Sequence, residues 1–211
     1  FSGCSEQSIC RMRDIEWFTQ AFMTCNVHTK ERFFRDDDMD WFFEIGEGKP
    51  MSKVEEYDRA ERRRFISILE TIHITVQQQQ AVPASKRIPQ RTFWALLAVA
   101  EHFYDSNGKY TIHSYDQFYR DVQGIDSRLV NDSKHAQSSD LKAAQKDNPH
   151  LDDDEISKLA PDNDYYWSQC RRMEAPTHRN NRKSTLIDEV GAQIRAGNFP
   201  SILAPVALAS K

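Results

Sequence analysis

The basic and aromatic residues in the last quarter of the chain have types and spacing that suit contact with a ligand. Basic side chains recur over residues 171–183 with one acid, Glu174, among them, and aromatic side chains come just before. Guanidinium groups contact phosphate oxygens, and aromatic faces stack on bases. We therefore predict a nucleic-acid contact made by Tyr166, Trp167, Arg171, Arg172, Arg179, Arg182 and Lys183. The alternative is a solvated helix end that faces the acidic residues 152–164.

A second basic group, formed by Arg59, Arg62, Arg63 and Arg64, follows the acidic residues Glu55, Glu56 and Asp58. Acidic and basic side chains three or four residues apart on a helix form ion pairs with each other. We therefore expect this group to have a structural role.

Acidic side chains gather at residues 36–38 and 152–155. Carboxylates at helix starts usually cap free backbone amides, although paired acids also bind divalent cations. A metal-dependent enzyme with a dispersed acidic site, involving Asp36, Asp38 and Asp154, is thus an alternative function. The seven histidines form no HxxxH or HExxH pair, so we expect no metal ligands and no cofactor.

The motifs of nucleophilic and nucleotide-binding enzymes are missing from the sequence. It contains no GxSxG, GxGxxG or GxxxxGK[ST] string. The four cysteines include no CxxC pair, which favours free thiols in a reducing compartment and predicts a cytoplasmic protein.

Composition indicates a helical domain and excludes several classes. The 211 residues are 39% hydrophobic and 28% charged, which argues against a disordered or collagen-like chain. No apolar run approaches the roughly 20 residues that span a bilayer, so we expect no membrane contact. The net charge of -4 gives no overall electrostatic argument for nucleic acid. Only 7 glycines and 8 prolines favour long helices over a turn-rich β protein.

Apolar periodicity predicts an all-α fold, an irregular bundle of about seven helices. The expected helices cover residues 11–25, a short stretch after Asp38, and 52–76, then one from Pro89 and one from Ser114. A further helix follows Asp152, and the last runs from about Arg182 to a stop at Gly197. The expected buried stripes include Ile15, Phe18, Phe22 and Cys25 in the first helix, and Phe93, Leu96, Leu97, Ala100 and Phe103 in the fourth.

The bundle divides into three segments by composition. Residues 1–130 form a helical core domain, and residues 151–211 form a C-terminal helical segment that packs on this core. Residues 131–150 have few large apolar groups, so we expect a mobile excursion or at most a short surface helix there.

The stretch of residues 11–17, with its Arg-x-x-Asp-x-Glu pattern, resembles one in the GmrSD-type family of bacterial restriction and phage-defence proteins. These proteins have a ParB-like N-terminal domain followed by a helical region. The aromatic and acidic residues 33–43, the helix over 54–76 and the phenylalanine-led helix over 93–103 follow in the family's order. The resemblance covers about residues 10–130 and extends to the tail with Arg179 and Arg182.

The resemblance implies a helical, non-catalytic region of a larger defence protein, which holds domains together and contacts DNA or a partner domain or subunit. The family's Asp-Gly-Gln-Gln-Arg motif and its His-Asn-His nuclease half do not occur here, so no catalytic residue is carried over. The chain begins at Phe1, which agrees with the expectation of a fragment. A separate alternative is a protein-interaction module that uses Trp41, Phe42 and Phe43.

Overall fold

The computed structural model describes residues 13–26, 54–79, 88–106, 108–152, 155–156 and 175–203. These residues contain the helices α2 (Arg13–Cys25), α4 (Val54–Gln77), α5 (Gln90–Asp105), α6 (Tyr115–Asp147) and α9 (Pro176–Arg195). The predicted all-α class is confirmed. The described residues hold five helices instead of about seven, and the two further expected helices, after Asp38 and Asp152, fall mainly outside them.

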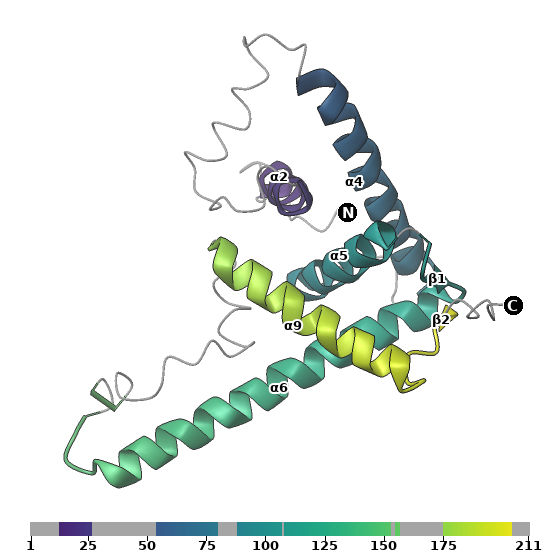
Figure 1. Ribbon diagram of the computed structural model, residues 1–211. Coiled ribbons are helices and arrows are strands. Elements are labelled where there is room, and N and C mark those ends of the chain that lie inside the picture. The colour runs from purple at the N-terminus through teal and green to yellow at the C-terminus, as the bar shows by residue number, and fades with distance from the viewer. Residues whose placement is uncertain are drawn as a thin grey trace, which may run out of the picture.

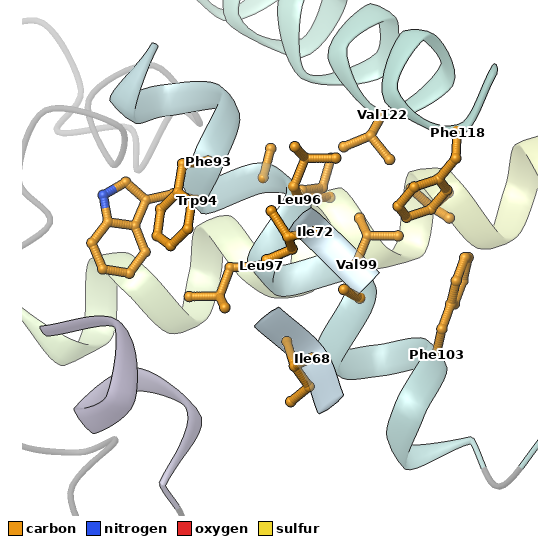
Figure 2. Packing of buried hydrophobic residues seen from close by; sticks show 14 of the residues in the cluster. Ile68, Ile72, Phe93, Trp94, Leu96, Leu97, Val99, Phe103, Phe118 and Val122 are labelled. Carbon is orange, nitrogen blue, oxygen red and sulfur yellow. The ribbon is translucent and has the colours of Figure 1, made fainter. Parts of the chain in front are cut away.

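Helix α5 is the centre of the core. It contacts α2, α4, α6 and α9, and ten of its residues are buried. Figure 2 shows Phe93, Leu96 and Val99 of α5 among Ile72 of α4 and Val122 of α6. The predicted stripe on this helix is confirmed, because Phe93, Leu96, Leu97, Ala100 and Phe103 are all buried. Burial on nearly all sides explains why this helix carries so few charges.

The first helix buries only part of its predicted face, since Cys25 is in the core but Phe18 is not. Ala21, Met23 and Cys25 of α2 are in the core, whereas Phe18 is 53% exposed and Phe22 is only partly buried. Both phenylalanine rings instead meet Phe65 of α4 edge to face, with centroids 5.4 and 5.1 Å away. The Phe18 and Phe22 side chains of α2 thus pack on α4 at the rim of the core.

Helix α6 runs without interruption through residues 131–147, where a mobile excursion or a short surface helix was expected. The expected domain boundary at residue 130 therefore falls inside a helix. Lys, Gln and Ala, which favour helix, are frequent in this part, and Ser133 and Ser139 donate hydrogen bonds to carbonyls four residues back. No residue of 131–147 is buried, and Figure 1 shows this half of α6 extending away from the other described helices.

Helix α9 begins at Pro176, about two turns before the predicted start near Arg182. Proline is favoured in the first helical turn because its missing N–H has no partner there anyway. Leu186 and Val190 are buried as predicted, and α9 packs on α5 and α6 (Figure 1).

A short ladder fixes the chain after α9. Strand β2 (Ile202–Leu203) pairs antiparallel with β1 (Thr111–Ile112), which precedes α6. The Ser201 N–H and hydroxyl both donate to Asp121 Oδ2 of α6, at 3.2 and 2.6 Å. These bonds hold the end of the described chain against the start of α6.

Two glycine substitutions are expected to change stability in opposite directions. Gly197, just past the end of α9, has φ +73°, so Gly197→Ala should lower the free energy of unfolding by about 1–2 kcal/mol. Gly124 lies inside α6 with open space around its missing Cβ, so Gly124→Ala should raise it by about 0.5–1 kcal/mol. Urea unfolding of both variants measures the two effects. Changes of the same sign would contradict these backbone conformations.

Candidate functional site

The seven residues predicted to contact nucleic acid divide into two groups. Tyr166, Trp167, Arg171 and Arg172 lie outside the described residues. Arg179, Arg182 and Lys183 lie in the first two turns of α9, which pack against α5. Only the second group can be placed in the fold.

Arg182 is inside the protein, with 4% of its surface exposed. Its Nη2 donates to Asp126 Oδ1 of α6 at 3.2 Å and to the carbonyl of Arg91 in α5 at 3.1 Å. Asp126 also pairs with Arg91 Nε at 2.8 Å, so one buried carboxylate joins α5, α6 and α9. Arg179, one turn earlier, is 3% exposed. The burial of both arginines favours a structural role over contact with a nucleic-acid backbone.

Lys183 belongs to a set of four charged side chains that we call the Glu101 network: Arg64, Glu101, Asp105 and Lys183. Glu101 of α5 is 4% exposed. Its carboxylate accepts from Lys183 Nζ at 2.6 Å and from Arg64 Nη2 of α4 at 2.8 Å. Arg64 also pairs with Asp105 at 2.5 Å and donates to the Cys25 carbonyl of α2 at 2.5 Å. Arg64 has the structural role expected for the second basic group, but the main partners of Arg64 lie on other helices.

The network changes the ionisation of its members and neighbours. Burial alone would lower the pKa of Arg64, but the hydrogen bonds to Asp105 and Glu101 outweigh it and raise that pKa above its usual value. Burial, aided by the nearby Glu101 carboxylate, raises the pKa of the Cys25 thiol. Cys25 is therefore protonated and unreactive at neutral pH.

A pocket of about 130 Å³ lies where α2, α5 and α9 meet. Its apolar lining includes Trp94, Leu97 and Leu186. Its polar lining comes from Thr24, Glu101, Arg179, Asn180, Arg182 and Lys183. The three cations are recognisable in the sequence as candidate site residues, but Glu101 and Asn180 are not, because nothing in the sequence indicates that α9 packs across α5.

The acidic residues that suggested a metal site are partly accounted for by helix capping. The Glu155 N–H donates to Asp152 Oδ1 at 2.8 Å, and the Asp152 N–H donates to Glu155 Oε2 at 3.2 Å. This reciprocal pair is a capping box. Asp36, Asp38 and Asp154 lie outside the described residues, within which no cluster of three or more His, Cys, Asp or Glu side chains could hold a metal ion.

The three aromatic residues of the predicted protein-interaction module, Trp41, Phe42 and Phe43, also lie outside the described part of the chain. No helix among the described ranges is both long and apolar enough to cross a bilayer.

Comparison of the chain with family models, with curated proteins and with solved structures finds no match in any of the three. The resemblance to the GmrSD-type family therefore stays a prediction.

Proposed function

We propose that this chain is a helical, non-catalytic region of a larger restriction or phage-defence protein. In that role it holds other parts of the protein in a fixed arrangement and contacts DNA. The order of α2, α4 and α5 supports the proposal, since these helices follow one another as the family resemblance expects.

The observation that carries the scaffold role is the position of Glu101. Its carboxylate binds Arg64 of α4 and Lys183 of α9, and Arg64 reaches on to the Cys25 carbonyl of α2. Three helices and the end of a fourth thus meet at one buried acid. Losing one partner of a buried ion pair is costly, about 3–5 kcal/mol, so such a network resists separation of the helices. A fixed arrangement of helices suits a part that positions other domains.

The DNA contact is assigned to the first group of basic and aromatic residues, Arg171 and Arg172 with Tyr166 and Trp167. Arg179 and Arg182 are buried and Lys183 is paired with Glu101, so these three side chains stabilise the bundle. Arg171 and Arg172 supply charge for phosphates, and the two aromatic side chains supply faces for bases.

The salt dependence of DNA binding tests this assignment. Full-length protein should bind duplex DNA with an affinity that falls as salt rises, because the bound cations release counterions from the phosphates. Arg171→Gln/Arg172→Gln should make the slope of log affinity against log salt shallower by about 1.8, since each lost phosphate contact removes about 0.9. Fluorescence anisotropy with a labelled duplex measures both slopes.

The control is Lys142→Gln/Lys146→Gln, which removes the same charge from the exposed half of α6. This variant should keep the slope of the unmodified protein. Absence of binding at low salt, or an equal change of slope in both double variants, would contradict a DNA contact at Arg171 and Arg172.

A further inference from the structure

We draw no further inference here: the strongest candidate, the exposed face of α4 that carries Arg59, Arg63 and Ile66, supports no proposal because nothing in the described part of the chain shows what covers it.

Discussion

Glu101→Gln is expected to lower the free energy of unfolding by about 3 kcal/mol. Glutamine keeps the size of the side chain but removes the charge, which leaves Arg64 and Lys183 facing a neutral amide in a buried place. The loss should be near the lower end of the range for broken buried ion pairs, because Lys183 is 33% exposed and recovers part of its hydration. Chemical unfolding followed by circular dichroism measures it.

Glu70→Gln is the matched control, because it makes the same substitution at an exposed position of α4. It should change the free energy of unfolding by less than about 0.5 kcal/mol. If the two variants lose the same stability, the Glu101 network does not hold the helices together.

Phe118→Ala is expected to cost about 3–5 kcal/mol of stability, the range for deleting a buried aromatic ring. Phe118 of α6 is 0% exposed. Its ring centroid lies 5.8 Å from that of Phe103 in α5 and 6.3 Å from that of Phe199 after α9. The substitution therefore opens a cavity where three parts of the chain meet (Figure 2 shows Phe103 and Phe118).

Phe18→Ala removes the same ring from a position that is 53% exposed, so it should cost about 1 kcal/mol or less. The remaining cost comes from its edge contact with Phe65. Thermal and urea unfolding of both variants gives the comparison. A loss in Phe18→Ala as large as that in Phe118→Ala would contradict the described core.

Helices with strong apolar periodicity and clear end signals could be predicted from the sequence. The stripe of α5 is an example, since its apolar residues recur at three and four positions and Pro89 directly precedes the helix. Ser114 caps α6, accepting from the Gln117 N–H at 3.4 Å, and Gly197 follows the end of α9 with a positive φ. Helix ends of this kind depend on residues that are close in sequence, so a local sequence pattern predicts them.

Residues 131–147 could not be recognised as helix from their apolar pattern, because this part of α6 buries none of its side chains. Its helix depends on the propensity of its residues and on continuation from the buried turns before it. The start of α9 was misplaced for a related reason. Its first turns direct Arg179 and Arg182 inward, and a search for apolar residues does not count arginines as buried.

The candidate site was the least predictable part. Lys183 and Glu101 are 82 residues apart in sequence, and Arg182 and Asp126 are 56 apart. Their pairing depends on how α9 packs across α5 and α6, which no local pattern encodes. The run of basic residues therefore suggested a single binding surface, whereas Arg179 and Arg182 are buried and Lys183 is paired with Glu101.

The salt dependence of DNA affinity for the full chain tests the central claim, a scaffold that contacts DNA through Arg171 and Arg172, most directly. We expect the slope to become shallower by about 1.8 in Arg171→Gln/Arg172→Gln and to stay unchanged in Lys142→Gln/Lys146→Gln. A slope that stays the same in the Arg171→Gln/Arg172→Gln variant would contradict this claim.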